Sequence, residues 1–102
     1  MENNSRDRIN VAQFGVGYWG PNLLRNLISN PRFNVRAVVD LSEARRDFVK
    51  NIYPGIHVDS TPEAVFENPN IDAVVIATPV ATHYDLGIRA VKSGKHVLVE
   101  KP

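Results

Sequence analysis

The sequence predicts an α/β fold with a parallel sheet, because short apolar runs alternate with segments of helical periodicity along the chain. Such alternation requires crossover helices that cover both faces of the sheet. A continuous apolar run at 72–77 (DAVVIA) is typical of a strand that is buried on both faces. A glycine-rich turn after the first predicted strand is a third sign of this class. We therefore expect a doubly wound sheet.

Runs of apolar and β-branched residues predict five strands, at 9–14, 35–39, 56–58, 72–77 and 96–99. Helices are predicted between them, over 22–29, from a cap at Ser42 to the residues before Pro54, over 63–67, and over about 81–92. Asn30-Pro31 ends the first helix, because proline disfavours helical geometry in the residue before it. The sequence thus predicts four strand–helix units and a fifth strand.

Apolar stripes and end signals predict how these helices are oriented and capped. The stripes comprise Ala44, Phe48 and Ile52 in the second helix, and Tyr84, Ile88 and Val91 in the fourth. The third helix has two alternative starts, Ser60 with Glu63 in a capping box or Thr61 with Pro62 at the first helical position. Gly94 suits the end of the fourth helix, where Lys92 and Lys95 would favour the helix dipole.

Length and composition limit the class of protein. The 102 residues are room for one domain, which we place at 9–102 after a polar tail at 1–8. Twelve basic and 11 acidic residues leave a net charge of +1, which argues against a nucleic-acid or anionic-membrane surface. No cysteine is present, so disulfides and thiolate nucleophiles are excluded. No segment resembles a signal peptide or a membrane span, and a cytoplasmic location is expected.

The turn after the first predicted strand carries the first functional motif. Residues 15–20 (GVGYWG) match G-x-G-x-x-G, in which Gly15 allows a tight turn, Gly17 lets a pyrophosphate approach the backbone, and Gly20 lets helix and strand pack closely. The helix start adds N–H groups and the positive end of a dipole. The motif predicts a Rossmann-type sheet, with five of the usual six strands, and a cofactor-binding loop that includes Val16, Tyr18 and Trp19. A purely structural glycine-rich turn is the alternative.

Asp40 ends the second predicted strand, 20 residues after Gly20. At this place a carboxylate can accept hydrogen bonds from both hydroxyls of an adenosine ribose, although an aspartate here can also cap the next helix. The carboxylate would repel a 2′-phosphate, so NAD is favoured over NADP. Arg45 and Arg46 follow closely, either to compensate for that repulsion or as solvated side chains.

The glycine loop and Asp40 also suit S-adenosylmethionine methyltransferases, so further motifs are needed. Thr78-Pro79 follows the buried strand, His83 completes T-P-x-x-x-H, and residues 94–102 (GKHVLVEKP) close the chain. Together with the glycine loop, these motifs resemble the Gfo/Idh/MocA family, named for glucose–fructose oxidoreductase and inositol dehydrogenase. The resemblance runs from about residue 9 to residue 102, and 18–26 (YWGPNLLRN) looks most like members that act on nucleotide-activated sugars.

The resemblance implies a catalytic role for Lys101. Glu100-Lys101-Pro102 matches the family's E-K-P motif, whose lysine lies near the nicotinamide and the substrate. Glu100 and Lys101 are accordingly expected to contact the cofactor. A lysine at the C-terminal end of a parallel strand points into the crevice where such sheets bind ligands, and its ammonium can hold a developing alkoxide.

The resemblance also implies a cofactor role for Thr78-Pro79, whose family counterpart passes the nicotinamide ribose and pyrophosphate. His83 belongs either to the cofactor pocket or to the packing of a helix start. Trp19 either packs over the cofactor or fills the underside of the loop. No histidine pair has metal-ligand spacing, and no metal is expected.

Family members run to several hundred residues and carry a second domain that supplies substrate contacts, a catalytic histidine and the oligomer interface. We therefore expect this sequence to be the NAD-binding portion of an oxidoreductase of sugars, nucleotide sugars or polyols, inactive alone and homo-oligomeric through the second domain. Its last strand is expected to be an exposed edge on which two chains can pair. A non-catalytic nucleotide-binding or sensing module is the alternative, and a methyltransferase leaves 100–102 unexplained.

Overall fold

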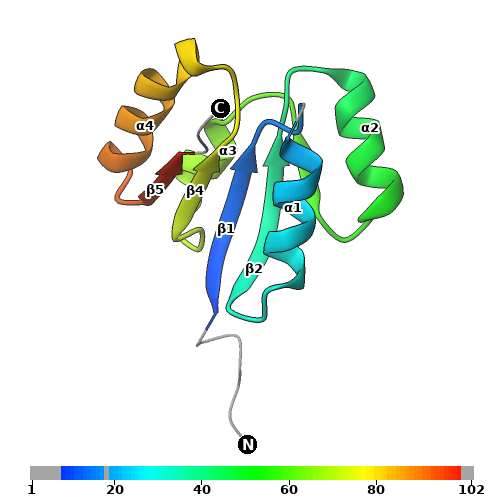
Figure 1. Cartoon of the computed structure of the whole chain (residues 1–102). Helices are drawn as coiled ribbons and strands as arrows, with labels where there is room; N and C mark the ends of the chain where they lie inside the picture. Colours follow the sequence, from blue (N-terminus) through cyan, green and yellow to red (C-terminus); the bar gives the residue numbers. More distant parts are fainter. Residues whose placement is uncertain (1–7, 18, 100–102) are drawn as a thin grey trace, which may run out of the picture.

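The computed structural model describes residues 8–17 and 19–99. Within them the chain forms β1 (Ile9–Phe14), α1 (Gly20–Ser29), β2 (Phe33–Val39), α2 (Glu43–Ile52), β3 (His57–Asp59), α3 (Glu63–Glu67), β4 (Ala73–Ile76), a 3-10 turn (Val80–Thr82), α4 (His83–Lys92) and β5 (His96–Val99) (Figure 1). The strands are parallel and lie in the order β3-β2-β1-β4-β5. The predicted doubly wound α/β fold is confirmed, and the winding direction reverses between β1 and β4.

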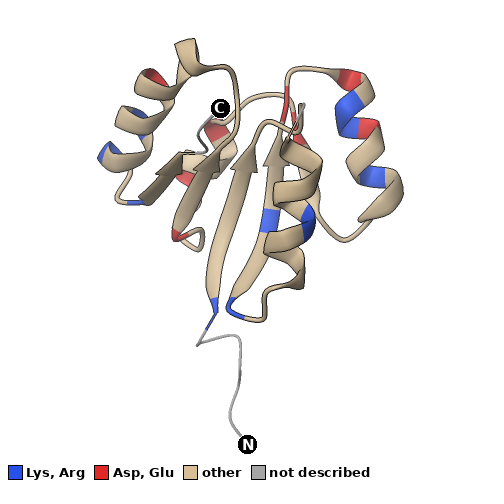
Figure 2. Ribbon diagram, in the orientation of Figure 1, with Lys and Arg blue, Asp and Glu red and all other residues tan. Residues whose placement is uncertain are grey.

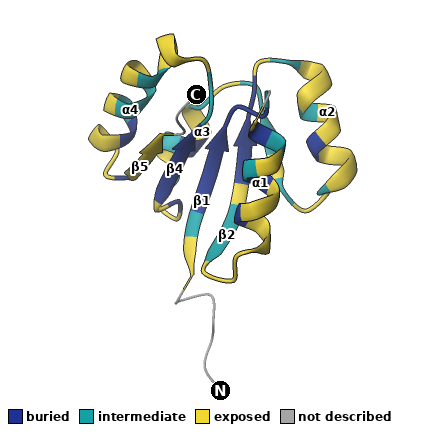
Figure 3. Ribbon diagram, viewed as in Figure 1, coloured by how far each residue is buried: buried dark blue, intermediate teal, exposed yellow. Residues whose placement is uncertain are grey.

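Two apolar cores lie on opposite faces of the sheet, and the central strands are buried between them (Figure 3). The helices α1 and α2 close one core, made of Val16, Leu24, Val38 and Val49. The helices α3 and α4 close the other, made of Ala12, Phe14, Ala37, Val39, Val65, Ile71, Val74, Ile76 and Ala90. Ala37, Val38 and Val39 of β2 alternate between these cores because successive side chains in a strand point to opposite faces.

The buried faces of α2 and α4 differ from the predicted stripes. The striped residues are largely exposed, with Phe48 at 42%, Ile52 at 50%, Tyr84 at 80% and Val91 at 62%. Instead, Val49 and Ala90 are fully buried, and Tyr53 and Leu86, each one turn away, pack beside them. A small side chain at the contact lets a helix approach the sheet closely.

The start of α3 uses neither predicted cap. Pro62 precedes the helix and makes no side-chain capping bond. The side chain of Asp59, at the end of β3, organises this turn instead, because its Oδ1 accepts from the N–H groups of Ser60 at 2.7 Å and Thr61 at 3.4 Å. An aspartate that bonds its own following backbone is a common turn device, and here it replaces the helix cap.

Lys95 has a different role from the predicted one. Gly94 ends α4 with φ +81°, as expected. The side chain of Lys95 is only 6% exposed, and its Nζ donates to the carbonyls of Asn68 at 2.7 Å and Ile71 at 2.9 Å. Burial lowers the pKa of this ammonium group, with a smaller opposing effect from the charge of Asp72. Lys95 therefore holds the segment that enters β4 rather than the end of α4.

The Asp59 turn predicts a pH-dependent stability. Donation from the backbone of Ser60, with a smaller contribution from Thr61, lowers the pKa of Asp59 below its ordinary value of 3.8. A lowered folded-state pKa stabilises the fold above the unfolded-state value, and this stabilisation is lost as the pH falls through the folded-state pKa. We expect Asp59→Asn to lower the thermal midpoint at neutral pH, by a difference that shrinks below about pH 3.8.

Circular dichroism melts from neutral to acid pH check this expectation. Glu67→Gln is the control, because it removes an exposed carboxylate that makes no hydrogen bond within the described residues. A deficit of Asp59→Asn that is the same at every pH would contradict the assignment.

The surface agrees with the even charge balance of the sequence. Lysine and arginine are spread over α1, α2, α4 and the start of the sheet, and acidic residues are mixed with them on α2 and α4 (Figure 2). None of the described helices is both long and apolar enough to cross a membrane. The strand β5 lies at the edge of the sheet, as predicted, with Leu98 51% and Val99 48% exposed.

Candidate functional site

Three loops that follow neighbouring strands meet at the end of the sheet where the parallel strands finish (Figure 1). They are the glycine-rich turn after β1, the turn at Asp40 after β2, and Thr78-Pro79 after β4. This C-terminal end of the sheet is the edge that forms the site. The N–H of Gly15 donates to the carbonyl of Val39 at 2.8 Å, and the N–H of Ala77 donates to that of Phe14 at 2.7 Å. The loops therefore surround the point between β1 and β4 where the winding reverses, which is where open parallel sheets bind ligands.

Two of the three predicted glycines are required by close backbone contacts. Gly15 has φ +94°, and a Cβ there would lie 2.8 Å from the carbonyl oxygen of Ala77. A Cβ on Gly20 would lie 2.9 Å from the carbonyl oxygen of Gly15, so the start of α1 rests directly on the loop. Both distances are shorter than any real Cβ contact, which explains why a side chain is excluded at each position.

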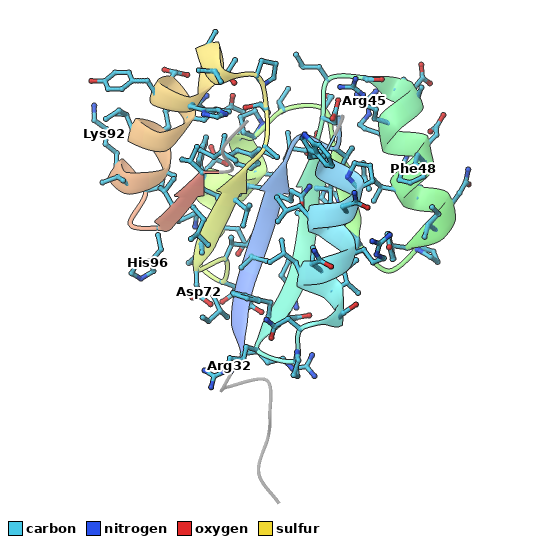
Figure 4. All side chains as sticks on the ribbon, in the orientation of Figure 1. Arg32, Arg45, Phe48, Asp72, Lys92 and His96 are labelled. Atoms are coloured by element: carbon cyan, nitrogen blue, oxygen red, sulfur yellow. The ribbon has the colours of Figure 1, made fainter. Side chains whose placement is uncertain are left out.

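Gly17 differs, because only a flexible side chain lies above it. A Cβ at Gly17 would lie 3.2 Å from Nη1 of Arg45, whose guanidinium reaches the loop from the first turn of α2. Arg45 lies at the edge where the strands end, whereas Asp72 lies at the start of β4 (Figure 4). The backbone at Gly17 can therefore be approached by a ligand once this side chain moves. Arg46 is held elsewhere, since its Nη1 donates to the carbonyls of Asp40 and Leu41.

The carboxylate of Asp40 joins the loop after β2 to the glycine-rich turn. Its Oδ2 accepts from the N–H of Val16 at 2.8 Å, and its Oδ1 accepts from the N–H of Ser42 at 2.9 Å. Asp40 does not cap α2, because that role belongs to Ser42, whose Oγ accepts from the N–H of Arg45. A carboxylate can accept about four hydrogen bonds, so roughly two acceptor positions of Asp40 are left for a ligand.

Gln13 is a site residue that the sequence analysis missed. It is fully buried beneath the glycine-rich turn, and its Nε2 donates to the carbonyls of Gly15 and Gly20, both at 2.9 Å. Its Oε1 is buried without a hydrogen-bond partner among the described residues, an arrangement that costs about 1–3 kcal/mol. The available signal was a single polar residue among the four buried residues of β1, two positions before the motif.

The third loop is held together by its own side chains. Nε2 of His83, at the start of α4, lies 2.7 Å from the carbonyl oxygen of Thr78, so this nitrogen carries the proton. The hydroxyls of Thr78 and Thr82 lie 2.6 Å apart, and that of Thr82 also donates to the carbonyl of Pro79. The ring of His83 is thus fastened to the loop that faces Gly15, and its place in the cofactor pocket stays a prediction.

The remaining predicted residues are placed as follows. Val16 is buried in the core under α1 and α2, and its N–H is engaged by Asp40. Trp19 is 55% exposed, and it is Gln13 that lies beneath the loop. Tyr18, Glu100 and Lys101 lie outside the described residues. Among the residues that are described, no three histidine or acidic side chains gather into a candidate metal site.

The residues at this edge fit a dinucleotide. The helix α1 has Pro21 in its first turn, no acidic residue there and no side-chain cap from Trp19. The N–H groups that a helix start leaves unused are thus available to an anion. A phosphate at Gly17, a ribose at Asp40 and a third contact at Thr78-Pro79 would follow one line across the edge. The fold and site define a dinucleotide-binding domain of the Rossmann class.

Comparison with known proteins agrees with this class. Residues 9–102 match the family model GFO_IDH_MocA, described as "Oxidoreductase family, NAD-binding Rossmann fold". The chain belongs to this family, which confirms the resemblance noted in the sequence.

Individual relatives cover nearly the whole chain. It is 38% identical over 96 residues to the uncharacterized oxidoreductase YdgJ of Escherichia coli, a match of 94% of this chain and 27% of that protein. It is 34% identical to scyllo-inositol 2-dehydrogenase (NAD(+)) of Bacillus subtilis, over 93% of this chain and 28% of that protein. The crystal structure of GenD2 from gentamicin A biosynthesis in complex with NAD superimposes with a TM-score of 0.86 at 33% identity, over 94% of this chain and 27% of that chain. The chain thus spans about a quarter of the length of these relatives.

Proposed function

We propose that residues 9–102 bind NAD and act as the cofactor domain of an oxidoreductase whose substrate is the hydroxyl group of a sugar, nucleotide sugar or polyol. The observation that carries the proposal is the bond between Asp40 and the N–H of Val16, which joins a ribose-binding carboxylate to a phosphate-binding turn. The family match and the relatives named as inositol dehydrogenases support the chemical class of the substrate.

Different residues of the site bind different parts of the dinucleotide. The start of α1 and the backbone at Gly17 hold the pyrophosphate, because they offer N–H groups and close approach. Asp40 accepts from the ribose hydroxyls with its remaining lone pairs. Gly15 and Thr78-Pro79, which lie against each other, guide the nicotinamide half. When bound, the nicotinamide supplies hydride chemistry.

Lys101 is the catalytic residue of the proposal, as the family's E-K-P motif implies for residues 100–102. β5 leads directly to this motif, and its C-terminal end lies beside that of β4. Because residues 100–102 follow the end of β5 in the sequence, we propose that the ammonium group of Lys101 acts at the same edge of the sheet as the other loops. There it can polarise a substrate hydroxyl and hold the negative charge that develops on its oxygen.

We propose a preference for NAD over NADP. Asp40 is 8% exposed and places a carboxylate where the 2′-phosphate of NADP would lie. Arg46 is engaged by backbone carbonyls, so Arg45 is the nearby cation left to offset the repulsion. Relatives include a scyllo-inositol 2-dehydrogenase named for NAD(+) and another named for NADP(+), so this preference is specific to the residues of each chain.

The wider setting is part of the same proposal. We propose a cytoplasmic protein that works on small molecules and not on nucleic acids or membranes, in keeping with its net charge of +1 and mixed surface. The base that takes the hydroxyl proton, most substrate contacts and the oligomer interface are assigned to a second domain. The exposed edge of β5 gives two chains a further place to pair.

Isothermal titration calorimetry with NAD, NADP and S-adenosylmethionine tests the choice of ligand. We expect NAD to bind more tightly than NADP. S-adenosylmethionine should give no binding heat, because it has no pyrophosphate for the glycine-rich turn to bind. Binding of S-adenosylmethionine without NAD would overturn the proposal in favour of a methyltransferase-like domain. Equal affinities for the two dinucleotides would overturn the preference while leaving the site intact.

A further inference from the structure

We propose that Gln13 is a positioning residue of the dinucleotide site. Its side chain holds carbonyl groups of the glycine-rich turn, while Asp40 holds an N–H group of the same turn. This inference rests on the proposed function and adds to it a residue outside the G-x-G-x-x-G motif. Gln13 is the last residue but one of β1, and its side chain points to the face covered by α1. The other residues of β1 on this face, Ile9 and Val11, are apolar.

The hydrogen bonds of Gln13 have one possible direction. Both groups within reach of its amide are carbonyl oxygens, those of Gly15 and Gly20, so the NH₂ group must face the loop. One side chain thereby connects the first and last glycines of the motif. Since α1 begins at Gly20, the same amide also ties the helix start to the strand.

The peptide unit between Gly15 and Val16 is held at both ends. Its carbonyl accepts from Gln13 at 2.9 Å, and its N–H donates to Oδ2 of Asp40 at 2.8 Å. The described residues contain no cis peptide bond, so the C=O and N–H of this unit point in opposite directions. Gln13 and Asp40 therefore act on one rigid plane, and a change at either residue rotates it.

The orphaned Oε1 supports a role in function rather than in stability. A buried acceptor without a partner is unfavourable, and an apolar side chain of similar size would avoid this cost. A residue that carries this cost and yet donates to two carbonyls of a ligand loop is expected to matter for the shape of that loop. Pre-shaped backbone donors lower the cost of ordering the site when a ligand binds.

Gln13→Met is the direct test, with ADP-ribose as the probe because it contains the ribose and pyrophosphate without the nicotinamide. We expect the affinity for ADP-ribose to fall about fivefold, the equivalent of one net hydrogen bond. Asn10→Leu is the matched control. At the opposite end of β1, it removes the bond that the Asn10 side chain donates to the carbonyl of Asn70 and the one that it accepts from Nδ2 of Asn34. This variant should lower stability without changing the affinity.

A double variant separates positioning from packing. In an Asp40→Ala background the bond from the Val16 N–H to residue 40 is lost, so Gln13→Met should cost less affinity there than in the unaltered chain. Equal costs in both backgrounds would overturn the shared-plane account.

Measurements on the unaltered chain do not depend on whether a variant folds. The side-chain NH₂ resonances of Gln13 should shift on addition of ADP-ribose, whereas those of Asn10 should not. Binding of ADP-ribose that leaves the Gln13 resonances or the Gln13→Met affinity unchanged overturns this inference alone. Failure of the unaltered chain to bind either ADP-ribose or NAD contradicts the proposed function itself.

Discussion

Replacing Asp40 with asparagine should reduce NAD affinity by roughly 10- to 100-fold, while NADP affinity changes little or rises. Hydrogen bonds to a charged group contribute about 1.5–3 kcal/mol, and each 1.4 kcal/mol is a factor of about ten in affinity. The carboxylate is 8% exposed and already accepts from two backbone N–H groups, so its geometry is fixed before any ribose arrives. Removing the negative charge also removes the repulsion of a 2′-phosphate.

Titration of both dinucleotides into the variant and the unaltered chain measures the effect. Asp47→Asn is the control, because it also removes a carboxylate near Asp40, in this case from α2. The carboxylate of Asp47 is exposed and makes no hydrogen bond within the described residues. If Asp40→Asn weakens NAD and NADP by the same factor, the residue acts only by holding the loop. The ribose role would then be wrong.

Replacing Gly15 with alanine should abolish detectable NAD binding and lower the free energy of unfolding. A residue with a side chain at φ +94° is strained by about 1–3 kcal/mol. The added Cβ would also lie 2.8 Å from the carbonyl oxygen of Ala77 and 3.0 Å from Cγ2 of Thr78. Relief of this contact requires the loops after β1 and β4 to move apart, and those two loops form the nicotinamide side of the proposed site.

Gly87→Ala is the matched control for this change. Gly87 lies within α4, and a Cβ there would meet nothing within 4 Å. Because glycine is unfavourable inside a helix, this variant should gain roughly 0.5–1 kcal/mol and bind NAD normally. Denaturant unfolding and NAD titration of both variants check the pair. Normal NAD binding by Gly15→Ala would show that the ligand does not use the loop as proposed.

The sheet was predictable because its signals are local. The buried run at 72–77 and the β-branched residues before Asp40 mark strands whose neighbours follow from the alternation with helices. The glycines of the turn were predictable for the same reason, since their spacing encodes one strand–turn–helix unit. The observed φ of Gly15 and the contact at Gly20 are the physical requirements behind that spacing.

Features that depend on contacts between distant segments were not predictable in this way. The buried faces of α2 and α4 are set by how closely each helix meets the sheet, so Val49 and Ala90 are inside although larger apolar residues lie nearby. The position of Lys95 after α4 predicts an interaction with the helix dipole, whereas its ammonium group donates to the carbonyls of Asn68 and Ile71, which are distant in the sequence. The carbonyls that Gln13 binds come within its reach only when the glycine-rich turn folds back over β1.

The most direct test of the central claim is an amide chemical-shift map of the ¹⁵N-labelled chain during titration with NAD. We expect the amides of Gly15, Gly17, Gly20, Ser42 and Thr78 to shift together and to saturate at one concentration. A small cleft of about 140 Å³ lies between β2, β3 and α3 and is lined by Arg36, His57, Val65 and Asn68 among others. The amides of these residues should stay unchanged. Shifts confined to that cleft, or no saturable shift at the glycine-rich turn, would contradict the assignment of this edge of the sheet as a dinucleotide site.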